Sequence, residues 1–93
     1  MSSTAITRTV VVRNPNGLHA RPADMLVREA NRHQSEIVLE KDGTRADCKS
    51  ILSLLTLGAA CGTEMSLIAE GADAEQAAAM IVELFENGFH ELE

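Results

Sequence analysis

At residues 17–23 the sequence reads Gly17-Leu18-His19-Ala20-Arg21-Pro22-Ala23, between an apolar β-like run and an amphipathic helical pattern. A glycine can take backbone conformations that are barred to other residues, which allows a sharp exit from a strand into a helix. Pro22 fits the first helical turn, where its missing N–H is no loss. The stretch therefore predicts a strand-to-helix junction with a histidine near the start of the helix.

His19 and Arg21 are residue types that suit a phosphate site at such a junction. The first backbone N–H groups of a helix are unpaired and carry the positive end of the helix dipole, so an anion is favoured there. The guanidinium of Arg21 adds a planar set of donors that matches phosphate oxygens. A histidine with an ordinary pKa also keeps a neutral, nucleophilic fraction near pH 7. We therefore interpret His19 as a phosphoryl acceptor and Arg21 as a residue that holds the phosphate.

The elements on either side of this junction follow from apolar periodicity. Residues 5–13 are rich in β-branched side chains and predict a first strand, which the turn at residues 14–17 ends. After the junction, apolar residues recur at helical spacing and predict one buried face: Ala23, Leu26, Val27 and Ala30. Asp24 and Arg28 stand four residues apart on the other face, where they can pair.

Two strands and a short helix are expected next. Residues 36–40 predict a second strand, and Lys41-Asp42-Gly43-Thr44 contains the Asp-Gly signal of a tight hairpin that returns through residues 44–47. Ser50 is a good N-cap for a helix of about two turns that ends at Gly58. This helix is unusually apolar, so part of the set Ile51, Leu52 and Leu55 is expected at the surface, as in a docking patch.

The chain closes with a strand and a long helix. Residues 62–69 alternate as a fourth strand. Asp73 is expected to cap the last helix, with Gln76 completing a capping box, and Asn87-Gly88 ends it. The stripe expected to be buried consists of Ala77, Met80, Ile81 and Leu84. The order β-α-β-β-α-β-α predicts an α+β fold with helices on one face of an antiparallel sheet, and residues 1–93 suit a single domain.

Composition excludes several classes of function. The net charge of −6 argues against binding to nucleic acid or to an acidic membrane, since both need a basic surface. Cys48 and Cys61 are too few for a disulfide scaffold and lack the spacing of a zinc site, so we expect free, buried or half-buried thiols and no metal. No signal peptide or membrane span is recognisable, which predicts a cytoplasmic protein without membrane insertion.

The GLHARPA heptamer at residues 17–23, the segment Lys49-Ser50-Ile51-Leu52 and the helix end Leu57-Gly58 together resemble HPr, the histidine phosphocarrier family of the bacterial phosphotransferase system. The resemblance extends from about Thr7 to Glu86. It implies an open-faced β-sandwich, in which three helices cover one face of a four-stranded antiparallel sheet. The tail at residues 84–89 resembles the nitrogen-related branch, NPr, whereas residues 15–19 resemble the sugar branch, so the branch stays open.

The resemblance also implies a function and partners. Nδ1 of His19 would accept a phosphoryl group from enzyme I and pass it to an enzyme IIA domain, with Arg21 on the phosphoryl oxygens and without a cofactor. Such a protein is a carrier, and a monomer, rather than an enzyme with a product of its own. The apolar docking patch would consist of Leu18, Ala20, Ile51, Leu52 and Leu55.

Ser50 opens an alternative function. It matches the serine that HPr kinase/phosphorylase modifies in many Gram-positive members of the family, and phosphate there would add negative charge to a docking surface. The chain would then be a regulatory binding protein or a nitrogen-branch signalling protein; a plain N-cap is the simpler interpretation of Ser50. A domain that binds a small molecule is a third possibility. His33 and His90 lack any motif and are expected at the surface.

Overall fold

The structure is a computed structural model that describes residues 5–91 of the 93-residue chain. Along the chain it contains eight elements: β1 (Ala5–Val11), α1 (Ala20–Ala30), β2 (Glu36–Lys41), β3 (Thr44–Asp47), α2 (Ile51–Leu55), β4 (Glu64–Glu70), α3 (Ala74–Glu86) and a 3₁₀ turn, η1 (Gly88–His90). The predicted order of strands and helices is confirmed, with boundaries that shift by a few residues.

The four strands form one antiparallel sheet in the order β1-β4-β2-β3. Strand β4 lies inside the sheet, where Leu67 pairs with Arg8 on one side and with Leu39 on the other. Successive side chains of a strand point to opposite faces, so the apolar positions of β4 and β2 gather on one face. This face is buried and the other face is open to solvent.

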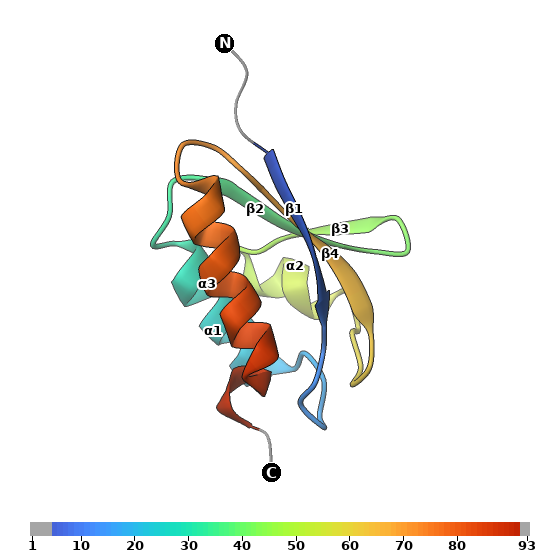
Figure 1. The fold of residues 1–93 in the computed structure, drawn as a ribbon. Helices are drawn as coiled ribbons and strands as arrows, with labels where there is room; N and C mark the ends of the chain where they lie inside the picture. The colour runs from blue at the N-terminus through green and yellow to red at the C-terminus, as the bar shows by residue number, and fades with distance from the viewer. Residues whose placement is uncertain (1–4, 92–93) are drawn as a thin grey trace.

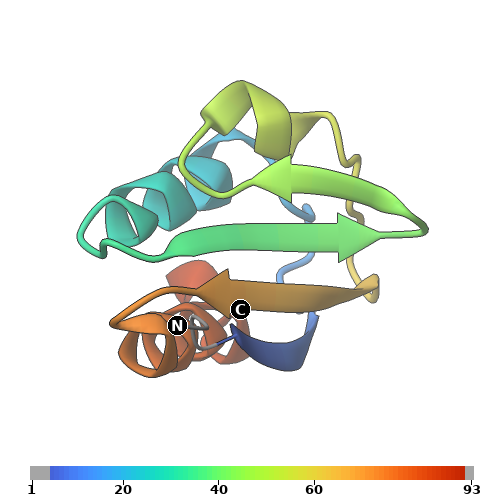
Figure 2. The same ribbon diagram turned by 90° about the horizontal axis from the view of Figure 1, so that it is seen from above.

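Three helices cover the buried face of the sheet (Figure 1). Helix α3 lies against β1 and β4, while α1 contacts both α2 and α3. The view from above shows β3, β2 and β4 side by side, with α2 next to β3 at the top and α3 next to β4 and β1 at the bottom (Figure 2). The fold is therefore the expected α+β open-faced sandwich.

Apolar side chains of the sheet and the helices meet in one core. Its largest fully buried apolar members are Phe85, Phe89, Leu26, Ile37, Leu39, Leu54, Leu67 and Ile81. Phe85 and Phe89 pack edge to face with ring centroids 5.0 Å apart, a favoured aromatic geometry. The sequence has no aromatic ring of Phe, Tyr or Trp besides these two, so the rest of the core is built mainly from aliphatic side chains.

Several local predictions are confirmed at atomic detail. Asp42 and Gly43 both have positive φ, 50° and 84°, as a two-residue hairpin of this type requires. The Asp24 carboxylate accepts a hydrogen bond from Arg28 Nε at 2.8 Å. Ser50 Oγ accepts a hydrogen bond from the backbone N–H of Ser53 at 3.2 Å and caps α2. These features depend on neighbours within four residues, so the local sequence specifies them.

The predicted capping box at the start of α3 is wrong. The Asp73 side chain makes no capping bond to its own helix. Instead it accepts hydrogen bonds from the Ser35 hydroxyl at 2.5 Å and from the backbone N–H groups of Gln34 and Ser35 at 3.0 Å and 2.9 Å. These bonds, the Ser35 side chain first, hold the pKa of Asp73 well below its ordinary value. Asp73 thus ties the start of α3 to the segment that leads into β2.

Three further expectations about burial need correction. Met80 is 37% exposed, and the buried side of α3 consists of Ala74, Ala77, Ala78, Ile81 and Phe85. Cys48 is buried, which raises the pKa of its thiol to about 12, but Cys61 is exposed. The side chain of His33 is only 7% exposed and contacts two carboxylates, Glu29 Oε2 at 2.8 Å and Asp73 Oδ2 at 3.5 Å. Within the described residues, no helix has the length and apolar character that a membrane crossing requires.

Candidate functional site

His19 lies at the N-cap position of α1, with an extended backbone conformation (φ −89°, ψ −168°). Its side chain is 39% exposed and makes no capping hydrogen bond to the helix. The backbone carbonyl of His19 accepts the first helical hydrogen bond, from Ala23 N at 3.0 Å. The ring is therefore attached at the start of the helix and is free to act on another molecule.

The turn that presents His19 is held by a close approach of two loops. Gly17 has φ +74°, and a Cβ at this position would lie 2.7 Å from the carbonyl oxygen of Ala59. The next backbone N–H, that of Leu18, donates to the same oxygen at 2.8 Å. A residue larger than glycine would strain the backbone and push this pair of loops apart. Gly17 thus accounts for the position of the histidine.

Two residues that sequence analysis did not assign to the site, Asn14 and Glu91, contact this turn. Glu91 Oε1 lies 3.1 Å from His19 Nε2 and also accepts a hydrogen bond from Asn14 Nδ2 at 3.1 Å. Asn14 is fully buried and donates a second bond, at 2.6 Å, to the carbonyl of Gly17. Asn14 stands next to the motif in a recognisable turn, but Glu91 is 72 residues away from His19. No local pattern could have placed Glu91 here.

The Glu91 contact determines which ring nitrogen of His19 is available. An ionised carboxylate can only accept hydrogen bonds, so Nε2 carries the proton and donates it. The hydrogen bond from His19, followed by the one from Asn14, lowers the pKa of Glu91 and keeps it ionised. Within residues 5–91, Nδ1 of His19 makes no hydrogen bond. Nδ1 therefore holds the free lone pair of the neutral ring.

Donors for an anion remain free beside the ring. The backbone N–H groups of Ala20 and Arg21 make no hydrogen bond with the described part of the chain, as expected for the first turn of a helix. The Arg21 side chain is exposed and has no ion pair with any residue from 5 to 91. Arg21 is the second residue of α1 and so lies at this end of the molecule, and its charge contributes to the lowered pKa of Glu91. Unpaired N–H groups at a helix start, together with an arginine, favour an anion in this place.

The residues expected to dock partners lie mostly on the surface, with one exception. Leu52 is 73% exposed, Ile51 and Leu55 are 37% and 39% exposed, and Ala20 is exposed at the start of α1. Leu18 is only 5% exposed and belongs to the core, because its backbone is drawn against Ala59. The exposed apolar patch is therefore Ala20, Ile51, Leu52 and Leu55, without Leu18. A shallow hollow of about 270 Å³ beside His19 is lined by Asn16, Leu18, His19, Gly58, Ala59 and Ala60.

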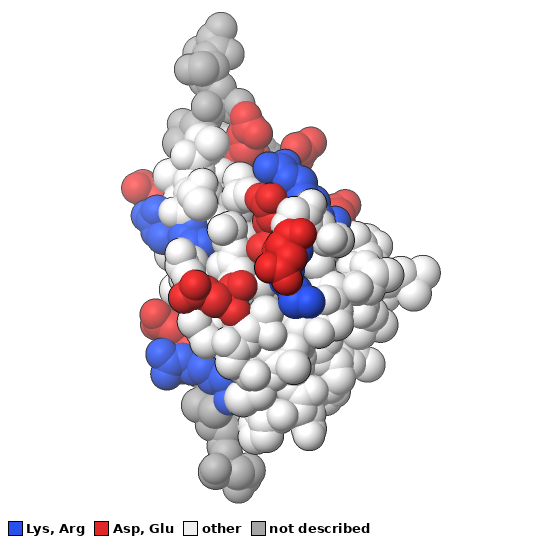
Figure 3. Space-filling view, turned by 90° about the vertical axis from the view of Figure 1, so that its right-hand side faces the viewer, with Lys and Arg blue, Asp and Glu red and all other residues white. Residues whose placement is uncertain are grey.

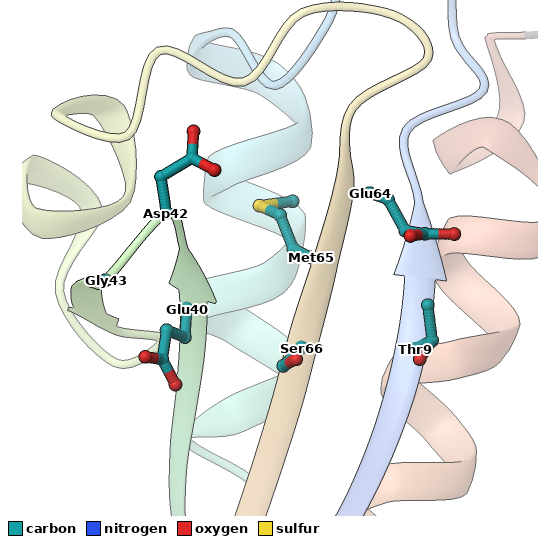
Figure 4. A pocket seen from close by; sticks show the side chains of 7 residues that line it. All are labelled: Thr9, Glu40, Asp42, Gly43, Glu64, Met65 and Ser66. Atoms are coloured by element: carbon teal, nitrogen blue, oxygen red, sulfur yellow. The ribbon is translucent and has the colours of Figure 1, made fainter.

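A second hollow, of about 320 Å³, lies on the open face of the sheet and is lined by Thr9, Glu40, Asp42, Gly43, Glu64, Met65 and Ser66 (Figure 4). Its carboxylates point away from one another rather than toward a common centre (Figure 4). The space-filling view turned toward this side shows acidic and basic side chains mixed over the middle and the left of the molecule and uncharged side chains at the lower right (Figure 3). Three carboxylates repel a phosphate, so this hollow does not compete with the His19 site.

Comparisons with known proteins place nearly the whole chain in one family. The family model described as "PTS HPr component phosphorylation site" matches residues 6–87. The phosphocarrier protein HPr of Treponema pallidum is 42% identical over 86 residues, which cover 92% of this chain and 98% of the relative.

Solved structures agree with the sequence relatives. A crystal structure of HPr from Thermoanaerobacter tengcongensis superposes with a TM-score of 0.91 at 39% identity and covers 95% of this chain and 99% of its own. The Bacillus subtilis catabolite repression protein Crh, a domain-swapped dimer, has a TM-score of 0.73 at 41% identity, with 89% and 95% coverage. By sequence and by fold, this chain belongs to the HPr family.

Proposed function

We propose that this chain is a phosphocarrier that accepts a phosphoryl group on Nδ1 of His19 from enzyme I and passes it to an enzyme IIA domain. The observation that supports this most strongly is the position of the His19 ring. Its protonated Nε2 faces Glu91, and its free Nδ1 lies at the start of α1, where unpaired N–H groups and Arg21 favour an anion.

The transfer is an in-line displacement at phosphorus. The Nδ1 lone pair of His19 attacks the phosphoryl group of the donor; the Nδ1–P bond forms while the donor's N–P bond breaks, and the donor nitrogen keeps the electron pair. The N–H groups of Ala20 and Arg21, together with the Arg21 guanidinium, hold the phosphoryl oxygens. The side chain of His19 remains partly exposed, so the next acceptor can attack from the open side.

Partner recognition is assigned to the exposed apolar patch defined above. Helix α2, which carries Ile51, Leu52 and Leu55, contacts α1, so the patch and His19 belong to adjacent helices. Exposed aliphatic side chains of this kind typically mark a protein interface. In this proposal the carrier works in the cytoplasm as a monomer, and light scattering of the purified protein should give the mass of one chain. The mass of two chains would instead indicate a dimer, as in Crh.

The proposed acceptor can be tested directly. Incubation with phosphoenolpyruvate and enzyme I should add one acid-labile phosphate to the protein, measured by intact mass. The His19→Ala variant should show no added phosphate, because no other group replaces Nδ1. His90→Asn, which removes an exposed histidine and keeps a residue type that tolerates positive φ, is the matched control and should accept phosphate like the wild type. Unmodified wild-type protein, or full modification of His19→Ala, would contradict the proposal.

A regulatory role through Ser50 is the second candidate, favoured by the similarity to Crh. Ser50 caps α2 and is half-buried, so a phosphate on its oxygen would lie at the start of that helix, beside Ile51 and Leu52. It would bring up to about two negative charges to the apolar patch and weaken docking there. Incubation with HPr kinase and ATP should then give one acid-stable phosphate that Ser50→Ala lacks. Absence of this product with an active kinase would exclude the second role.

A further inference from the structure

The C-terminal turn that carries Glu91 has an unusual backbone. Gly88, Phe89 and His90 have φ values of 59°, 54° and 62°, so three successive residues lie in the left-handed region. For the two residues that are not glycine this conformation costs roughly 1–2 kcal/mol each. Such a segment persists only where the surrounding structure holds it in place.

Packing of Phe89 holds this turn. The ring of Phe89 is fully buried and contacts that of Phe85 on α3. Burial of a phenylalanine side chain contributes about 1.5–3 kcal/mol, which offsets much of the backbone cost. The turn redirects the chain after α3 and brings Glu91 to His19. In Figure 1 the red segment that follows α3 lies at the same end of the molecule as the loop after β1.

We propose that Glu91 is a positioning residue for phosphoryl transfer at His19. This inference rests on the proposed phosphocarrier function. Glu91 Oε1 accepts the Nε2 proton of His19 at 3.1 Å, and the buried Asn14 amide holds the same oxygen in place. The carboxylate thereby selects the tautomer with its lone pair on Nδ1 and fixes the direction in which Nδ1 points.

Glu91 also has an electrostatic effect during the reaction. When the Nδ1 lone pair forms the bond to phosphorus, the ring acquires positive charge, and the Nε2 proton stays on the ring throughout. A carboxylate on Nε2 stabilises this charge, as an aspartate does for the imidazolium of a serine-protease triad. When the phosphoryl group leaves for the next acceptor, its bonding electron pair returns to Nδ1 and the ring becomes neutral again. Glu91 itself neither bonds to phosphorus nor takes up a proton.

Two substitutions of Glu91 separate its effect on the His19 tautomer from its effect on the charge of the ring. Glu91→Gln keeps an oxygen that can accept the Nε2 proton but removes the charge, whereas Glu91→Ala removes both. The control is Glu83→Gln, which neutralises an exposed glutamate of α3. Far-ultraviolet circular dichroism should be the same for all variants, because the core anchor Phe89 is retained.

The first measurement is the rate of phosphorylation by phosphorylated enzyme I and, separately, by the small donor phosphoramidate. We expect Glu91→Gln to be about 10-fold slower and Glu91→Ala up to about 100-fold slower with both donors, the range found for hydrogen-bond partners behind functional histidines in metal sites. Glu83→Gln should stay within about twofold of the wild type. Wild-type rates for both Glu91 variants would overturn the inference.

The second measurement is the ¹⁵N NMR spectrum of the His19 ring at a pH at which the ring is neutral. The wild type and Glu91→Gln should show the proton on Nε2, and Glu91→Ala should show a mixture of tautomers. An unchanged tautomer in Glu91→Ala would overturn the positioning role. If the wild type accepts phosphate from neither donor, both the phosphocarrier function and the role of Glu91 in phosphoryl transfer are wrong. The NMR spectrum still shows in that case whether Glu91 selects the tautomer of His19.

Discussion

His19 and His33 lie at opposite ends of α1, and the ring of each contacts a carboxylate. His19 precedes the first turn of the helix, is 39% exposed and contacts one carboxylate through Nε2. His33 follows the last turn, is 7% exposed and has a carboxylate at both ring nitrogens. The comparison shows why the two rings differ in availability. A carboxylate contacts one ring nitrogen of His19 and leaves the other without a partner among the described residues, whereas both ring nitrogens of His33 contact carboxylates.

The two ends of the helix also differ in the charge that they favour. The N-terminus favours an anion, which suits a phosphoryl group on His19, whereas the C-terminus favours a cation. At the C-terminal end, His33 joins Glu29 of α1 to Asp73 at the start of α3, and Lys49 Nζ donates to the His33 carbonyl at 2.9 Å. The second end is therefore a structural clamp between elements.

The largest expected loss of stability is at the N-terminal end of α1, in the turn that precedes His19. Gly17→Ala should destabilise the protein by about 2–4 kcal/mol, because the left-handed backbone and the 2.7 Å approach to Ala59 O both oppose a Cβ. Urea denaturation measures the free energy of unfolding. Gly43→Ala is the control, since Gly43 also has positive φ but has nothing within 4 Å of its Cβ position. Equal losses in the two variants would show that the close approach of the loops contributes nothing.

A smaller loss of stability is expected from a substitution of His33, whose side chain is buried. His33→Gln should lower the free energy of unfolding by about 1–3 kcal/mol, because the imidazole that lies between Glu29 and Asp73 is lost and the poorly exposed Glu29 carboxylate keeps Arg32, at 3.8 Å, as a weaker partner. Phosphorylation at His19 should remain. His90→Asn, at an exposed position and with a residue type that also tolerates positive φ, should change stability by less than about 0.5 kcal/mol. If His33→Gln stopped phosphorylation while the protein stayed folded, the division between a reactive and a structural histidine would be wrong.

The smallest expected effect is a change in how the stability of the protein depends on acidic pH when Asp73 is substituted. The pKa of Asp73 is lower in the folded protein than the value of about 3.9 for an unfolded chain, so its contribution to stability is present above that pH and is lost as the pH falls below it. The urea midpoint of the wild type should therefore fall more steeply below about pH 4 than that of Asp73→Asn. Glu83→Gln is the control and should follow the wild type. Parallel curves for Asp73→Asn and the wild type would contradict the assigned hydrogen bonds.

Local predictions succeeded where the deciding contacts lie within a few residues. The Asp42-Gly43 hairpin and the Ser50 cap each depend on neighbours that the sequence places side by side. The capping box at Asp73 failed because backbone and side-chain donors of Gln34 and Ser35, far away in sequence, compete for the same carboxylate. A sequence pattern contains no information about such a competitor.

The sequence by itself determined the order of strands and helices, the apolar faces and the His19–Arg21 pair at a helix start, because each depends on periodicity or on a short motif. Only the tertiary structure decided that Leu18 is buried, that His33 is a clamp and that Glu91 reaches the ring of His19. These features depend on packing between distant segments. The left-handed turn at residues 88–90 is stable only because Phe89 is inserted into a core to which every element contributes.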